Sequence, residues 1–370
     1  MKLIILKDNL KKGLSVIERV VSENASLPIL KNILIKTQSS KIKISATNLE
    51  LGINKFIAGK ITEEGGLTIP FTTFYSLVTN TDTERIVLET SKNNLIFKTD
   101  NYQARLQGIN EEEFPLLPKI QEPQLELEVS SSALKEALLK IAGAAQISEI
   151  RPELSGVLFD FQLTILKLVA TDSFRLAQKT ITEKYFKTAQ NKGLKAIIPL
   201  KTIQEIIRNF EEDKQLVISF DQNQLFIKSE DQEMISRLID GQYPDYEQII
   251  PKSTETELIL NKEKVIGAVR LVSSLSGKIN DIKLTVKDGK ALEIYSASQY
   301  LGEGSYLVPA KIQGPGFKDL TFNWRYLLEG LKGVDSETAF LGVNGDSRPS
   351  IIKSPSEPSY LYILMPIKAG

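Results

Sequence analysis

The order of apolar and polar residues predicts one structural unit that occurs three times along the chain. Apolar residues recur at helix spacing in three segments about 125 residues apart, 8–23, 131–146 and 261–276. Each segment is followed by two stretches of alternating apolar residues, as expected for half-buried strands, and then by a turn of small residues. The three turns hold an alanine at equivalent places, Ala46, Ala170 and Ala297.

A second, shorter helical pattern follows a further strand in each copy, in segments 71–80, 200–210 and 324–333. In the first two copies Pro70 and Pro199 stand where the helix should begin, a place that tolerates proline. Each copy then closes with another strand pair and a peptide rich in proline and aromatic residues. This order predicts an α+β fold of three repeated domains, each an antiparallel sheet with two helices on one face.

The length of the chain agrees with several domains. At 370 residues it is longer than a single domain built around one hydrophobic core usually is. Polar, proline-containing stretches near 119–124 and 251–255 read as linkers between the copies. We therefore expect domain boundaries that divide the chain into residues 1–121, 122–252 and 253–370.

Composition narrows the chemistry that the chain can perform. It contains no histidine and no cysteine. Ser-His-Asp and Cys-His catalysis, His-ligated zinc and disulfide bonds are therefore excluded. Chemistry based on carboxylates alone remains open.

The first residues, MKLIILKDNLKK, hold an apolar run of only four residues between charges. A signal peptide needs a longer apolar core, and no run in the chain approaches the ~18 apolar residues of a membrane span. We expect a soluble cytoplasmic protein that does not act at a membrane.

The 46 basic and 46 acidic side chains cancel, so any attraction to nucleic acid must come from local clustering. The six predicted helical segments carry 12 Lys or Arg against 7 Asp or Glu. Lys12 and Arg19, like Lys201 and Arg208, are seven residues apart and should share one side of their helix. Taken alone, a solvated helix face is the simpler explanation. If nucleic acid is the partner, these cations would contact phosphates without reading the sequence.

Four motifs spread over the chain carry a specific resemblance. They are Leu27-Pro28-Ile29-Leu30, Val169-Ala170-Thr171-Asp172 with Arg175-Leu176, Asp240-Gly241 with Tyr243-Pro244-Asp245-Tyr246, and Met365-Pro366-Ile367-Lys368. Together with the length and the threefold repeat, they resemble the bacterial sliding clamp family, the DNA polymerase III beta subunits.

The resemblance implies that two chains close head-to-tail into a ring around double-stranded DNA, as a processivity factor without catalysis, metal or cofactor. The implied partners are the DNA polymerase III catalytic subunit, the clamp loader and other proteins with a clamp-binding motif. Simple geometry agrees with a dimer. Six helices, each ~10 Å across, would enclose a hole of about 10 Å, whereas twelve leave about 28 Å, wide enough for a duplex.

The resemblance also maps functional residues onto this sequence. The partner-peptide pocket would comprise Leu154, Thr171, Ser173, Phe174, Arg175, Leu176, Pro244, Gln248, Ile249, Ile363, Leu364, Met365, Pro366 and Ile367. DNA would be contacted by Lys12, Arg19, Arg151, Lys201 and Arg208. The joint between the two chains would involve Ala104, Leu106, Leu271 and Val272. Ser173-Phe174 and Gln248 depart from the residues that are common in the family, which leaves the peptide preference open.

Two other classes of function remain open. An enzyme could use carboxylates with Mg²⁺ at Asp172 or Asp240, although such sites usually cluster two or more carboxylates and Asp172 has no close acidic neighbour in the sequence. A scaffold unrelated to DNA would be a monomer that forms no ring.

Overall fold

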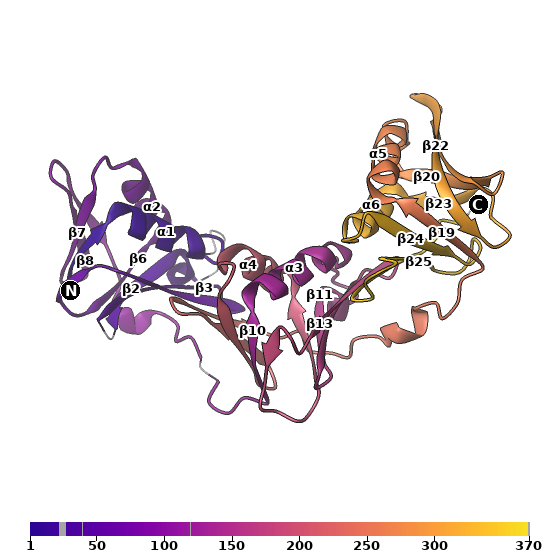
Figure 1. Cartoon of the computed structure of the whole chain (residues 1–370). Coiled ribbons are helices and arrows are strands. Elements are labelled where there is room, and N and C mark those ends of the chain that lie inside the picture. Colours follow the sequence, from indigo (N-terminus) through magenta and orange to yellow (C-terminus); the bar gives the residue numbers. More distant parts are fainter. Residues whose placement is uncertain (22–26, 39, 119, 369–370) are drawn as a thin grey trace. The chain divides into compact units, whose positions relative to one another are not determined.

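The chain folds into antiparallel sheets packed against short helices (Figure 1). The structure is a computed structural model that describes residues 1–21, 27–38, 40–118 and 120–368. Its contacts divide the chain into two units, Met1–Ser131 with Asn209–Leu238, and Ser132–Arg208 with Ile239–Gly370. The predicted central domain therefore contributes strands to both units, because backbone pairing extends the two larger sheets from one sequence repeat into the next.

Two antiparallel sheets form the first unit. Their strands are β1 (Lys2–Leu6), β2 (Asn32–Gln38), β3 (Lys41–Thr47), β4 (Leu51–Ile57), β5 (Lys60–Glu63), β6 (Gly66–Pro70), β7 (Arg85–Ser91), β8 (Asn94–Lys98), β9 (Gln103–Gln107), β10 (Leu125–Ser130), β16 (Gln215–Phe220), β17 (Gln224–Lys228) and β18 (Gln232–Arg237). The smaller sheet has the order β5-β1-β7-β8-β9, and the part of the larger sheet that lies within this unit runs β10-β16-β17-β18-β4-β3-β2-β6. The pairing of β18 with β4 joins strands of the first and second repeats.

Two helices pack in the first unit. Helix α1 (Lys7–Ile17) buries its apolar face through Leu10, Leu14 and Ile17. Helix α2 (Phe71–Asn80) begins directly after Pro70, as predicted, and buries Phe71, Phe74 and Val78. The prediction of one helix over 8–23 is wrong, because α1 ends at Ile17 and residues 18–20 form a turn. Residues 22–26 lie outside the described part of the chain.

One continuous antiparallel sheet forms the second unit. Its strands are β11 (Gly156–Phe161), β12 (Ile165–Thr171), β13 (Arg175–Thr182), β15 (Leu194–Pro199), β19 (Thr256–Asn261), β20 (Asp281–Lys287), β21 (Ala291–Ser298), β22 (Gly302–Gln313), β23 (Leu320–Asn323), β24 (Thr338–Val343), β25 (Ser350–Lys353) and β26 (Tyr360–Leu364). They run in the order β15-β11-β12-β13-β26-β25-β24-β19-β22-β21-β20-β23. The pairing of β13 with β26 unites the second and third repeats in one sheet.

The remaining helices are α3 (Ser131–Ile141), α4 (Leu200–Asn209), α5 (Lys262–Ser273) and α6 (Trp324–Lys332). Helices α5 and α6 contact each other, and α6 packs on β26. Antiparallel sheets with six α-helices in the described residues confirm the predicted fold class. Among these residues no helix combines the length and the apolar character that a bilayer crossing requires.

A cluster of ion pairs ties α3 to the third repeat within the second unit. Lys140, near the end of α3, binds Glu136 at 2.7 Å and also pairs with Asp335. Lys179 of β13 lies 3.3 Å from Glu357 and 3.7 Å from Asp335. Two cations therefore share carboxylates that come from distant parts of the chain.

We expect this cluster to weaken in acid. Burial alone would raise the pKa of Asp335, but Lys140 and Lys179 outweigh burial and lower the pKa below its ordinary value of 3.8. Such a carboxylate contributes stability above its unfolded-state pKa, and the contribution is lost as the pH falls through the lowered folded-state value. Asp335→Asn should therefore lower the melting temperature at pH 7 by roughly 1–3 °C, since solvent screens this half-exposed pair. Thermal unfolding below about pH 4 should show a smaller difference. An equal difference at both pH values would contradict the assignment.

Candidate functional site

A groove of about 550 Å³ opens on the second unit. Its walls come from the turn after β12, the segment that leads into the third repeat, the loop after β24 and the end of β26. The lining residues are Thr171, Ser173, Phe174, Arg175, Gln248, Ile249, Ile250, Pro251, Lys252, Ser253, Asn344, Arg348, Pro349, Ile363 and Met365. The volume is in the range of sites that hold a small ligand or a few peptide side chains.

The turn between β12 and β13 is fixed by its own polar side chains. Thr171 donates its hydroxyl to the Arg175 carbonyl at 2.6 Å, and Asp172 Oδ1 accepts the backbone N–H groups of Phe174 and Arg175 at 2.9 and 3.0 Å. Ser173 adopts a φ of 77°, which lets the chain reverse sharply. The turn holds the Phe174 ring 64% exposed at the edge of the groove.

Arg175 is a fixed cation beside this turn. Its Nε lies 2.9 Å from Asp172 Oδ2, it pairs with Glu329 of α6, and its guanidinium lies 4.0 Å from the centre of the Tyr326 ring. Burial alone would lower the pKa of Arg175, but Tyr362, Glu329 and Asp172 raise it above its ordinary value. Arg175 therefore stays charged and links the groove to α6.

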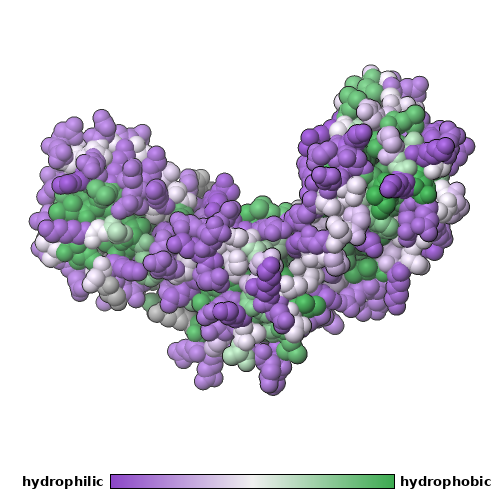
Figure 2. Space-filling model, viewed as in Figure 1, coloured by the Kyte–Doolittle hydropathy of each residue, from purple (hydrophilic) through white to green (hydrophobic). Residues whose placement is uncertain are grey.

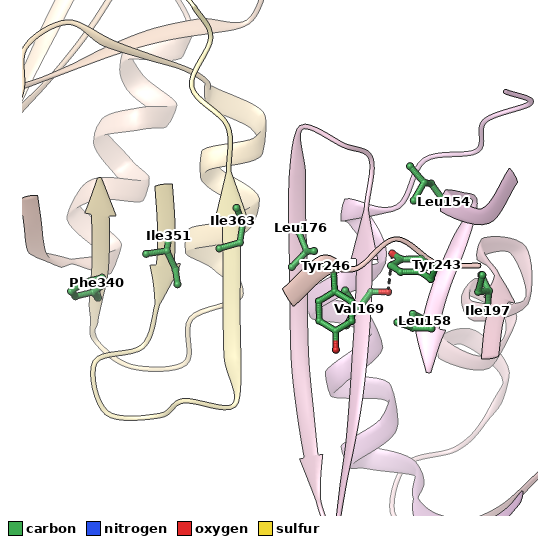
Figure 3. Close-up of a cluster of buried hydrophobic side chains, with 10 residues drawn as sticks. All are labelled: Leu154, Leu158, Val169, Leu176, Ile197, Tyr243, Tyr246, Phe340, Ile351 and Ile363. Atoms are coloured by element: carbon green, nitrogen blue, oxygen red, sulfur yellow. Dashed lines mark hydrogen bonds between the residues drawn. The ribbon is translucent and has the colours of Figure 1, made fainter. Parts of the chain in front are cut away.

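The floor of the groove rests on the sheet where β13 meets β26. Leu176 pairs with Ile363 across these two strands, and the Met365 N–H donates to the Phe174 carbonyl at 2.9 Å. Figure 3 shows the buried cluster around the pairing of β13 with β26. Leu176 and Ile363 lie on neighbouring strands, and the Tyr243 hydroxyl donates a hydrogen bond to the Val169 carbonyl. The cluster comprises Leu154, Leu158, Val169, Leu176, Ile197, Tyr243, Tyr246, Phe340, Ile351 and Ile363. A close-packed layer of this kind supports the groove from below.

Two side-chain interactions hold one wall of the groove in place. The short helix η5 (Tyr246–Ile249) carries Gln248 and Ile249 into the lining. On its inner side the buried Tyr246 hydroxyl donates to Asp160 Oδ2 at 3.0 Å, and on its outer side Lys167 binds Glu247 at 2.6 Å. Burial and the nearby Asp160 raise the pKa of Tyr246, so its hydroxyl keeps the proton that it donates.

The predicted pocket residues divide into two groups. Eight of them line the groove: Thr171, Ser173, Phe174, Arg175, Gln248, Ile249, Ile363 and Met365. Leu154, Leu176, Leu364 and Pro366 are buried instead, and Pro244 and Ile367 are half-buried outside the lining. Sequence reasoning missed seven lining residues: Ile250, Pro251, Lys252, Ser253, Asn344, Arg348 and Pro349. Pro251 and its neighbours had the composition of a linker, and residues 344–349 carry no recognisable pattern.

The predicted DNA contacts lie in different settings. Lys12 on α1 and Lys201 on α4 are exposed. Arg19 is exposed in the turn beyond the end of α1, so the prediction that it shares a helix face with Lys12 is wrong. Arg208 is half-buried and pairs with the buried Glu205. Arg151 bonds Ser173 Oγ and Glu153 Oε1, both at 3.1 Å, which places it beside the groove.

The residues predicted for a joint between chains lie on one edge strand, β9, and at the end of one helix, α5. Strand β9 is the last strand of the five-stranded sheet, with Leu106 6% exposed and Ala104 half-buried. At the end of α5, Leu271 is 62% exposed, whereas Val272 is buried. In the described residues, β22 pairs with β21 over 302–309 but with β19 only from Ala310 on, which leaves a second open edge. Figure 2 shows a hydrophobic surface patch by α5 and the nearby end of β22.

Comparison with known proteins supports one family throughout the chain. The profile of the DNA polymerase III beta subunit N-terminal domain matches residues 1–118. The profile of the central domain matches residues 128–245, and that of the C-terminal domain matches residues 247–368. The three matches follow one another in the order of the sequence repeats.

Whole proteins of this family align over the full chain. The beta sliding clamp of Synechococcus elongatus is 28% identical, with 100% of this chain and 99% of that protein covered. The crystal structure of the sliding clamp from Bacillus subtilis covers both chains fully at 25% identity, with a TM-score of 0.94. A Helicobacter pylori beta clamp solved with a DNA ligase peptide is 26% identical, with a TM-score of 0.91 over the whole of both chains. The chain therefore belongs to the family of bacterial DNA polymerase III beta subunits, the beta sliding clamps.

Proposed function

We propose that this protein is a DNA sliding clamp, in which two chains form a ring around duplex DNA and the groove on the second unit tethers partner proteins. The observation that carries the proposal is the groove, with its apolar floor on a continuous sheet and its turn fixed by internal hydrogen bonds. A related clamp from Helicobacter pylori was solved with a peptide of DNA ligase. A short peptide that inserts apolar side chains into such a groove would bury them at little cost in ordering the protein.

We propose three domains for the chain, at residues 1–121, 122–252 and 253–370. The order of elements supports this division, since each range opens with a strand and a helix, β1 with α1, β10 with α3, and β19 with α5.

The partners in this proposal are the polymerase catalytic subunit, the clamp loader and other proteins with a clamp-binding motif. We also place the protein in the cytoplasm.

The proposed joint pairs the open edge of β9 in one chain with the open edge of β22 in the other. Unpaired strand edges offer rows of backbone donors and acceptors that a second chain can complete. The exposed side chain of Leu271 lies at the end of α5, and Tyr306 and Leu307 of β22 are also exposed. These apolar side chains would be covered when the ring closes, with Ala104 and Leu106 on the other side of the joint.

A non-catalytic role is supported by the setting of Asp172, one of the two candidate carboxylates. The Asp172 side chain is 1% exposed, and its two oxygens accept bonds from the turn and from Arg175. A carboxylate that is already satisfied in this way offers no free ligand to a metal. In the described stretches of the chain, no three or more Asp, Glu, His or Cys residues gather closely enough to hold a metal ion.

A peptide titration tests the proposal. A labelled peptide of the type Gln-Leu-x-Leu-Phe should bind the protein at micromolar concentration, and Ile363→Asp should remove the binding. Because Ile363 is 2% exposed, the folding of that variant must be checked by circular dichroism. No binding to the folded wild-type protein would contradict the proposed use of the groove.

Tyr246 should position the wall of the groove without touching the peptide. Tyr246→Phe removes the hydrogen bond to Asp160 and leaves that buried carboxylate with fewer partners. We expect a loss of about 1–2 kcal/mol in the free energy of unfolding. Peptide affinity should fall by about two- to fivefold, because η5 is less firmly held. Isothermal titration and denaturant unfolding measure the two effects, and unchanged affinity would exclude a positioning role.

Reversing the charge of the exposed cations on the predicted helices should impair DNA loading and leave peptide binding in the groove unchanged. Changing Lys12, Arg19 and Lys201 together to Glu should reduce the amount of clamp loaded on DNA at least about tenfold, because phosphate attraction becomes repulsion. Arg208 is left intact, since Glu at that position would place two carboxylates beside each other at the buried Glu205. Gel filtration of loaded circular DNA measures the effect.

A matched control reverses the charge of three exposed lysines outside the helices. Lys60, Lys184 and Lys192 are exposed and lie on no helix. Their triple replacement by Glu should leave loading unchanged, and both triple variants should bind the peptide like the wild type. Equal loading by the two variants would remove the helical cations from the mechanism.

A further inference from the structure

The groove has a charge that the chain as a whole lacks. The 46 basic and 46 acidic residues balance. The groove, however, is lined by Arg175, Lys252 and Arg348 and by no carboxylate. A concave site lined by one sign of charge attracts ligands of the other sign.

The three cations differ in how far the protein already neutralises them. Arg175 is held by Asp172 and Glu329. Arg348 pairs with Glu255, although its side chain remains 62% exposed. Lys252 is exposed, and within the described residues its ammonium group makes no hydrogen bond or ion pair. Lys252 is therefore the cation whose charge is available to a ligand.

The backbone around Lys252 is held in place. Asn344 is 7% exposed, its Nδ2 donates to the Ser253 carbonyl at 3.1 Å, and its Oδ1 accepts the Glu255 N–H at 3.0 Å. Pro251 restricts the chain on the other side of Lys252. A ligand would thus meet a cation on an ordered segment and would have to order only the lysine side chain.

We propose that the groove prefers partner peptides that carry an aspartate or glutamate beside their apolar anchors, with Lys252 as the main contact and Arg348 as a second one. This inference rests on the proposed function of the groove as a peptide site. It adds a selection by charge to the apolar recognition that the groove provides. Selection there would rank the partners that compete for one clamp.

Matched peptides test the preference. Each pair shares the apolar anchors and differs only by Asp or Asn, at one residue before or after the anchors. At one of the two flanks the Asp peptide should bind about two- to fivefold more tightly at low salt, as expected for a solvent-exposed ion pair. The ratio should approach one at 0.5 M salt, because salt screens exposed charges.

Three variants assign the effect to the groove. Lys252→Gln removes the main contact and should reduce the ratio between the affinities of the Asp and Asn peptides to nearly one. Glu255→Gln frees Arg348 and should increase the preference, whereas Lys60→Gln, which makes the same charge change far away in sequence on β5, should have no effect.

The outcomes separate this inference from the function on which it rests. If Asp and Asn peptides bind equally at both flanks, the preference is overturned while the peptide site stands. If the preference is undiminished in Lys252→Gln, another group causes it and the assignment is overturned. If neither peptide binds the folded protein, both the preference and the peptide site are overturned.

Discussion

Peptide binding is expected to disappear when the chain is ended at Leu364. The truncation keeps β26 and its pairing with β13 but removes Met365, which lines the groove and donates its N–H to the Phe174 carbonyl. It also removes the bond from the Ile367 N–H to the Thr321 carbonyl, 2.8 Å long. A buried anchor at the centre of an interface contributes about 2 kcal/mol or more, so we expect a loss of affinity of at least about 30-fold.

A point variant tests the contribution of Met365 without shortening the chain. Met365 is half-buried, and Met365→Ala leaves the backbone bonds of the terminal segment intact. Loss of the flexible thioether should still weaken peptide binding about tenfold or more. Fluorescence anisotropy measures both variants. Wild-type affinity in both would mean that the end of β26 does not form the peptide site.

Leu271→Asp is expected to convert the protein into monomers. Leu271 lies at the end of α5 with 62% of its surface exposed, so its substitution leaves the core of the unit intact. In the proposed joint the aspartate would be buried without a partner, which costs several kcal/mol at each of the two joints of the ring. Sedimentation equilibrium should give the 41.3 kDa mass of one chain, and twice that mass for the wild type. A dimer that persists in Leu271→Asp would show that the joint lies elsewhere.

Leu106 is a poorer choice for this test, although the sequence predicts it for the same joint. It is only 6% exposed, and it pairs with Leu95 across β8 and β9. An aspartate there would disrupt the five-stranded sheet itself. Loss of the dimer would then report unfolding and not the joint. Glu263→Gln, on an exposed residue at the opposite end of α5, is a suitable control and should remain dimeric.

The repeat in the sequence predicted most of the fold because it reflects local patterning. Alternating apolar residues such as Ile42 and Ile44 are buried in β3, and the helices after Pro70 and Pro199 begin where expected. The length of α1 could not be predicted in the same way. Apolar residues continue in helical register beyond Ile17, but periodicity alone does not determine where the backbone leaves the helix.

The site was less predictable than the fold. The resemblance identified apolar residues of the groove lining and apolar residues of the core beneath the groove. The sequence alone could not show which residue belongs to the lining and which to the core. Leu154 and Leu176 belong to the buried cluster, whereas Ile249 is half-exposed in the groove wall. Lys252 and Arg348 lie almost 100 residues apart, and only the pairing of β24 with β19 and β25 brings their segments to one groove. Such long-range contacts leave no local pattern.

Retention on circular DNA tests the central claim most directly. The protein is loaded by the clamp loader of its own organism onto a nicked circle, and the complex is filtered at 0.5 M salt. A ring that encircles the duplex should stay on the circle, because high salt weakens phosphate contacts but does not open a topological link. Cutting the circle once should release it, since it can then slide off the ends. Equal retention on the circle and on the cut DNA, or loss from both at this salt, would contradict encirclement.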